Sequence, residues 1–205
     1  MNEVSINKDV KLSPHLALPS VAALSHLSEL NGVHLSPHFT LGELCKTSYH
    51  PLDGNIPSHV AIENLTRLCL WLELLREEYN RRYEESEEIP VVITSGYRSE
   101  EVNRLWGGAK GSNHLTGCAV DIRCMGPEHQ IRMASILLDI ADGTKRDLTS
   151  SRVCSHSAES MQASLCARSN ADFDELILEK RGSTRWIHFA VRPSGNRRKI
   201  LFDMR

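Results

Sequence analysis

The chain has 205 residues, a formal net charge of −2 and a hydrophobic content of 40%. This length fits one domain with extensions, and the apolar content is enough for a buried core. Because the charge is nearly balanced and no apolar run approaches the length of a transmembrane helix, we expect neither a nucleic acid nor a membrane among its partners.

The first part of the chain predicts helices. A helix is expected over about 20–30, and Thr40 with Glu43 forms a capping box for a short second one. Pro57-Ser58 then opens the longest helix, whose apolar residues recur at helical spacing and are expected to be core: Ile62, Leu65, Leu68, Cys69, Leu72, Leu75 and Tyr79.

Short strands follow, and one of them carries a carboxylate. A strand is expected over 91–94, and the segment 112–117 is expected to reverse direction at Gly117 and lead into a strand over 118–124. Side chains alternate along a strand, so Asp121 lies in the middle of an apolar segment. A buried, unpaired carboxylate costs several kcal/mol, so Asp121 requires a partner, either a metal ion or an arginine.

The next segment predicts a helix and then a long connection. Gly126-Pro127 starts the helix and Gly143 is expected to end it. The serine-rich stretch 144–170 is typical of an inserted surface loop, and its length favours a lid, a partner contact or disorder. Cys154 and Cys166 lie in this loop and could form a disulfide, but we expect free thiols because a reducing cytosol disfavours one.

A second hairpin is predicted near the end of the chain. Strands are expected over 176–179 and 186–191, joined by a turn over 180–185. A lone histidine such as His188 is more often a core residue than a ligand. Glu179 would lie opposite Trp186 and therefore on the same side as His188, whereas a shift of one residue would send it to the other side.

His114, Asp121 and His188 together form a candidate metal site. Two imidazoles and a carboxylate suit Zn²⁺, and three protein ligands leave the fourth tetrahedral position for the water that a hydrolase requires. The sequence therefore predicts a zinc hydrolase.

Several motifs surround these residues in a specific order. Ile93-Thr94-Ser95-Gly96-Tyr97-Arg98-Ser99 precedes Ser112-Asn113-His114-Leu115-Thr116-Gly117-Cys118-Ala119-Val120-Asp121-Ile122, and Phe173-Asp174-Glu175-Leu176-Ile177-Leu178-Glu179 precedes Trp186-Ile187-His188. With these motifs, the chain from 35 to 194 resembles the D-alanyl-D-alanine carboxypeptidase family of zinc peptidases. It resembles in particular the short, endolysin-like branch common among phage and prophage lysis proteins.

The resemblance implies that His114, Asp121 and His188 bind zinc. It also implies a role for Arg98, whose counterpart in related dipeptidases helps to stabilise the developing charge, as a guanidinium can. The alternative for Arg98 is an ion pair with a nearby acid. Ser112 would face the same side as His114 in an extended segment and could bind the substrate backbone, or it could only fix the turn.

The general base is the point at which this sequence departs from many relatives. They carry an acid three residues before the last histidine ligand, where this chain has Arg185, which cannot accept a proton. Glu179 is our candidate for the base, because the short branch often has a glutamate at this point. Asp174 and Glu175 are the weaker alternatives.

These elements predict an α+β domain over 35–205 after an N-terminal extension over 1–34. A small antiparallel sheet would carry the zinc, and helices would pack on its other face. The activity that the family resemblance implies is hydrolysis of peptide bonds in peptidoglycan stem peptides, as a carboxypeptidase or endopeptidase, and we expect a monomer. The first residues lack the pattern of a secretory signal, so we expect synthesis in the cytoplasm and action on the cell wall after release.

Two other functions stay open at this point. One is a zinc-stabilised binding module without catalysis, as in the Hedgehog signalling domain, which shares this architecture, and Arg185 favours it. The other is a zinc peptidase that acts on ordinary proteins. Arg98 and Ser112 beside the candidate ligands favour an enzyme.

Overall fold

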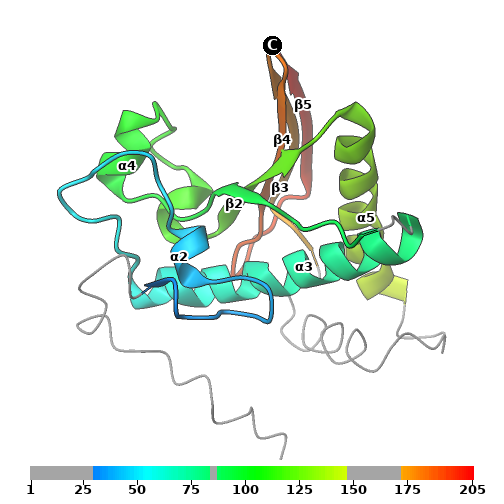
Figure 1. The fold of residues 1–205 in the computed structure, drawn as a ribbon, viewed down its shortest axis with the longest axis horizontal. Coiled ribbons are helices and arrows are strands. Elements are labelled where there is room, and N and C mark those ends of the chain that lie inside the picture. Colours follow the sequence, from blue (N-terminus) through cyan, green and yellow to red (C-terminus); the bar gives the residue numbers. More distant parts are fainter. Residues whose placement is uncertain (1–29, 84–86, 147–171) are drawn as a thin grey trace, which may run out of the picture.

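The structure is a computed structural model that describes residues 30–83, 87–146 and 172–205. It is an α+β fold, as predicted, with a five-stranded sheet and helices around it (Figure 1). In chain order its elements are α2 (Leu41–Leu44), α3 (His59–Tyr83), β1 (Ile93–Ser95), α4 (Glu100–Leu105), the 3₁₀ helix η2 (Asn113–Thr116), β2 (Ala119–Cys124), α5 (Pro127–Arg146), β3 (Glu175–Arg181), β4 (Thr184–Ala190) and β5 (Lys199–Met204).

The sheet has the strand order β1-β2-β4-β3-β5. The first four strands in this order are antiparallel, as expected, but β5 pairs with β3 in parallel, so the sheet is mixed. The sequence did not predict β5. The reason is that this edge strand exposes consecutive apolar side chains, from Ile200 to Phe202, and so lacks the alternation that marks a half-buried strand.

The hairpin between β3 and β4 is tighter than expected. Arg181 pairs with Thr184, so the turn consists of two residues, Gly182 and Ser183, in place of the predicted turn over 180–185. Gly182 has a φ of +60°, which glycine adopts without steric cost. Both strands are therefore longer than the sequence indicated, and their register is fixed up to the turn.

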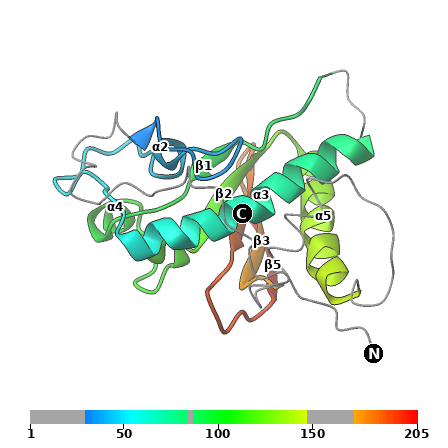
Figure 2. The same cartoon turned by 90° about the horizontal axis from the view of Figure 1, so that it is seen from below.

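The helices α3 and α5 contact each other and cover the face of the sheet opposite the candidate site (Figure 2). The predicted apolar stripe of α3 is buried along its whole length, from Ile62 to Tyr79. Trp71 of α3 packs on Phe189 of β4, with ring centroids 5.3 Å apart. Leu30, which precedes the predicted domain, is also fully buried in this core. Packing of α3 and α5 thus holds β2 and β4 in place from behind.

Some expectations fall on residues that the structure does not describe. Most of the helix predicted over 20–30 lies there, as do Cys154, Cys166 and nearly all of the loop predicted over 144–170. The helix α5 continues through Gly143 to Arg146, so that glycine does not end it. The four cysteines among the described residues are buried free thiols, as expected.

None of the described helices is both long enough and apolar enough to span a membrane.

Candidate active site

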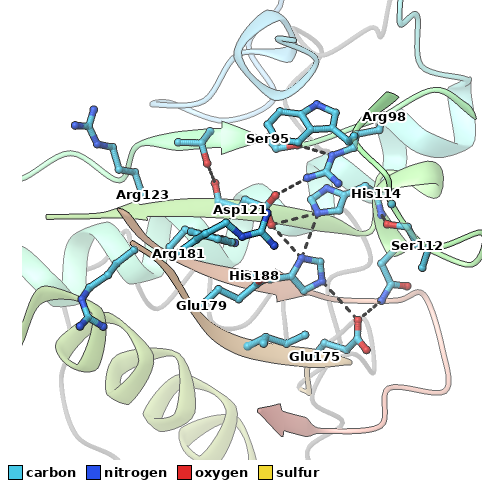
Figure 3. Close-up of a pocket in the computed structure, with 18 of the residues that line it drawn as sticks. Ser95, Arg98, Ser112, His114, Asp121, Arg123, Glu175, Glu179, Arg181 and His188 are labelled. Atoms are coloured by element: carbon cyan, nitrogen blue, oxygen red, sulfur yellow. Dashed lines mark hydrogen bonds and ion pairs between the residues drawn. The ribbon is translucent and has the colours of Figure 1, made fainter. Parts of the chain in front are cut away.

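The structure brings the three predicted zinc ligands together (Figure 3). Nε2 of His114 lies 3.2 Å from Nδ1 of His188 and 3.2 Å from Oδ1 of Asp121. Nδ1 of His188 lies 3.0 Å from the same carboxylate oxygen. All three side chains are buried, so three potential ligand atoms converge at one point.

Backbone geometry explains this convergence. Asp121 of β2 pairs directly with His188 of β4, so their side chains share one face of the sheet. His114 comes from η2, which ends at Gly117 with a φ of +70°. A Cβ atom at Gly117 would lie 2.5 Å from the carbonyl oxygen of Ala61, so glycine is required there for both reasons.

The outer nitrogen of each imidazole has its own partner. Nδ1 of His114 donates to the carbonyl oxygen of Gly96 at 2.6 Å. Nε2 of His188 lies 3.5 Å from Oε2 of Glu175, on the side away from Asp121 (Figure 3). Histidines that bind a metal usually donate their second N–H group in this way, which fixes the tautomer and the ring orientation. The donor set and its supporting contacts therefore fit a zinc ion.

Charges at this point favour an ionised carboxylate. Burial raises the pKa of Asp121, but the neighbouring His114 and His188 outweigh it and hold that pKa far below its usual range. Burial lowers the pKa of His114, which favours the neutral imidazole, the form that binds a metal. For His188, hydrogen bonds with Asp121 and Glu175 overcome burial and raise the pKa to about 9. A metal ion would compete with that proton.

Arg98 makes the ion pair that was the structural alternative for this residue. It donates from Nη2 to Oδ2 of Asp121 at 2.6 Å and from Nε to Oγ of Ser95 at 2.8 Å. Its guanidinium also lies over the ring of Trp106, 5.3 Å from the centroid. Asp121 thus turns one oxygen to the histidines and the other to Arg98. The catalytic role of Arg98 stays a prediction.

Ser112 caps the 3₁₀ helix that carries His114. Its Oγ accepts from the backbone N–H of His114 at 3.3 Å. The expectation of an extended segment was wrong, because the left-handed Gly117 allows the preceding residues to coil into η2. The structure therefore gives Ser112 the role of fixing the turn, although it also lines the cavity described below.

Glu179 lies on the same face as His188, as the predicted register requires. It pairs with Trp186, and the row of Ile177 and His188 comes next along the strands. Its half-buried carboxyl has a raised pKa, mainly through burial and then through the negative charge of Asp121, while His188 and a hydrogen bond from Trp186 oppose the rise. A raised pKa suits a group that must accept and return a proton. The role itself stays a prediction.

The two alternative acids are engaged elsewhere. Glu175 faces His188 and also accepts from Asn113 at 3.1 Å and from Lys199 at 3.2 Å. Asp174 is fully buried and forms a bidentate ion pair with Arg197, with both distances 2.7 Å. Sequence reasoning missed the contact of Glu175 with His188. The signal was present, because 175, 177 and 179 alternate onto one face.

Arg185 lies on the other face of the sheet from His188. The two positions are three residues apart, and residues an odd number apart on a regular strand point to opposite faces. Its Nη1 donates to Oε1 of Gln130 on α5, at 3.2 Å. In this register, an acid at position 185 would also be turned away from the candidate ligands.

The candidate ligands lie in the wall of a cavity of about 950 Å³. Ser112 borders it on one side of the ligands, and Glu179, Arg123 and Arg181 border it on the other (Figure 3). Trp106 also lines the cavity. This volume is at the upper end of the range for ligand sites and can hold a peptide segment.

The family follows from a comparison with known proteins. A sequence model of the family described as Peptidase M15 matches residues 37–149, which is more than half of the chain. The protein belongs to the peptidase M15 family. No curated protein matches the chain.

Membership of the M15 family confirms the resemblance found in the motifs, and the endolysin-like branch stays a prediction. M15 peptidases are zinc-dependent metallopeptidases, and the matched segment contains His114 and Asp121. His188 lies beyond the matched segment, and the pairing of β4 with β2 places it beside Asp121.

Proposed function

We propose that this M15 protein is a zinc-dependent peptidase that hydrolyses peptide bonds of peptidoglycan stem peptides, as a carboxypeptidase or an endopeptidase of the endolysin type. It would act on the cell wall after release from the cytoplasm. The observation that carries the proposal is the convergence of His114, Asp121 and His188 in the wall of a cavity, together with the family match.

His114, Asp121 and His188 would hold the metal ion. When bound, zinc would polarise the peptide carbonyl and lower the pKa of water towards roughly 7. Gly96 and Glu175, behind the two imidazoles, would keep the ligand nitrogens directed at the ion.

Glu179 would move the proton. As water attacks the carbonyl carbon, the carboxylate of Glu179 would accept a proton from the water. The protonated Glu179 would then donate that proton to the amine nitrogen as the C–N bond breaks. Support comes from its position on the ligand face, its place in the cavity wall and its raised pKa.

Arg98 would stabilise the negative charge that develops on the carbonyl oxygen. Its contacts with Ser95 and Asp121 use two of the five N–H donors of a guanidinium, which leaves donors for an oxyanion. The same contacts hold it rigidly, and a preorganised donor stabilises charge better than a mobile one.

The test is incubation of the zinc-loaded protein with peptidoglycan fragments of known structure, with and without a chelator, and analysis by mass spectrometry. Chelator-sensitive cleavage is expected, and the products identify the bond. His114→Ala should abolish cleavage and zinc binding, whereas the exposed His59→Ala should keep both. Cleavage of unrelated proteins, with intact wall fragments, would indicate a general peptidase.

A second candidate function is a zinc-stabilised binding module. It was favoured by Arg185 in place of the usual acid. Arg185 lies on the other face of the sheet, so its identity is a weaker argument against catalysis. Glu179 lies on the ligand face instead. Binding of one zinc ion without cleavage of any fragment would select the binding module.

A further inference from the structure

The face of the sheet that carries the candidate ligands is an ordered grid of side chains. Asp121, His188 and Ile177 form one row across β2, β4 and β3. The next row toward the hairpin contains Arg123, Trp186 and Glu179. Rows on one face are two residues apart along each strand, about 6.8 Å.

Two arginines in or next to this second row border the cavity. Arg123 lies on β2, and Arg181 lies on β3, two residues beyond Glu179. Both are exposed, with Trp186 of β4 between their strands. Figure 3 shows Arg123, Arg181 and Glu179 on one side of the candidate ligands and Ser112 on the other.

The other arginines that border the cavity are already engaged. Arg98 bonds with Asp121, Arg192 and Arg197 with Asp174, Arg185 with Gln130, and Arg205 with Asp203. In the part of the chain that the structure describes, the guanidinium groups of Arg123 and Arg181 form no hydrogen bond or ion pair.

The nearby acids do not remove this positive charge. Asp203 shares the row of Glu179, but Arg205 binds it through Nε and Nη2, at 2.8 and 2.6 Å. Arg181 interacts with Asp203 only through its longer-range charge. Glu179 is the remaining acid of this row, so two uncommitted guanidinium groups and one carboxyl line this part of the cavity. An open site of this kind favours an anion.

We propose that Arg123 and Arg181 form a subsite for a carboxylate of the substrate peptide, about two residues from the scissile bond. The inference rests on the proposed peptidase function and goes beyond it to specificity. An extended peptide advances 3.3–3.6 Å per residue, so the spacing of about 6.8 Å between the row of Arg123 and the row of the candidate ligands corresponds to about two residues. Trp186 would contact the apolar part of the same residue.

Stem peptides offer two sources of a carboxylate, the free α-carboxylate of D-Glu and the C-terminus. The experiment uses four versions of the peptide L-Ala-γ-D-Glu-L-Lys-D-Ala-D-Ala, in which D-Glu is linked through its side-chain carboxyl, with each of the two groups either free or amidated. The zinc-loaded full chain is mixed with each peptide. Cleaved peptides give kcat/KM, and intact peptides give a dissociation constant by NMR titration.

The wild-type protein should prefer the free form of one of the two groups about tenfold, the scale of one charge-assisted hydrogen bond. Arg123→Gln and Arg181→Gln should each remove most of this preference and leave the values for the amidated peptide unchanged. Arg81→Gln is the matched control, because it removes the same charge from an exposed arginine of α3 that is paired with Glu78. It should keep the preference.

Equal values for free and amidated peptides in the wild type would overturn the subsite, and so would an unchanged preference in both arginine variants. The proposed function fails by a separate result: the wild type cleaves none of the four peptides and no wall fragment. The carboxylate that binds is the one whose amidation lowers kcat/KM or raises the dissociation constant. Thermal unfolding of each variant identifies misfolded protein, and Arg123→Lys, which keeps the charge but not the planar fork, should retain part of the preference.

Discussion

Glu175 stands directly behind His188, with its Oε2 3.5 Å from the Nε2 of the imidazole. The contact orients His188 so that Nδ1 faces Asp121 and His114. Glu175 is in turn held by Asn113 and Lys199. A residue that is neither a candidate ligand nor part of the core therefore supports a candidate ligand.

Glu175→Ala should weaken zinc binding about 10- to 100-fold, the range found when the partner of a ligating histidine is lost. The reason is that the His188 ring loses its orientation and its basicity. Competition with a chromogenic chelator measures the affinity. Glu63→Ala, at an exposed position of α3, is the matched control. An unchanged zinc affinity in Glu175→Ala would show that the contact has no part in metal binding.

The metal-free protein should lose stability as the pH rises from about 6.5 to 9. His188 has a pKa of about 9 in the folded state, above the ordinary value of about 6.5. The proton bound by the folded state stabilises it fully below pH 6.5, and this contribution disappears as His188 deprotonates near pH 9. Chemical denaturation across this range measures the effect.

His188→Gln should remove that slope, because the titrating group is gone. Zinc-loaded protein should lack it too, since a metal ion replaces the proton. A metal-free wild type as stable at pH 9 as at pH 6.5 would contradict the raised pKa of His188.

The sequence was sufficient for the parts of the site that depend on alternation within a strand. Asp121 and Arg123 share a face of β2, and Trp186 and His188 share a face of β4, because the period of two leaves no other choice on a regular strand. The pairing of Glu179 with Trp186 was also predictable, because both strands flank a hairpin turn.

What depends on contacts between distant segments could not be predicted in the same way. The ion pair of Arg98 with Asp121 joins positions 23 residues apart and was one of two alternatives. The order of the whole sheet, with β2 beside β4 and β5 beside β3, also joins distant segments. The strand β5 was not predicted because its apolar side chains are exposed and do not alternate with polar ones. Phe202, for example, is 70% exposed.

Gly117→Ala should destabilise the fold by about 1–3 kcal/mol, the range for strained backbone positions. The residue has a φ of +70°, and an added Cβ would approach the backbone oxygen of Ala61 to 2.5 Å. Zinc affinity should fall as well, because η2 carries His114. Gly126→Ala, where nothing lies within 4 Å of the added atom, should change neither quantity. Equal unfolding curves for the two variants would count against the strain at Gly117.

Glu179→Gln should keep zinc and lower kcat by a factor of about 10²–10⁴, the contribution of a positioned general base. The amide has nearly the same shape, so the fold and the contact with Trp186 should persist, but it cannot accept the proton of water. Zinc content is measured by atomic absorption, and turnover with the wall fragment that the wild type cleaves.

Two variants separate this role from a general effect of charge. Glu128→Gln removes an equal charge from an exposed position of α5 and should leave kcat unchanged. Glu175→Gln removes a carboxylate next to His188 and should act mainly on zinc affinity, so activity should return at high zinc concentration. If Glu179→Gln is also restored by zinc, or stays fully active, the proton acceptor is another group, and the geometry of the β3–β4 hairpin serves substrate binding instead.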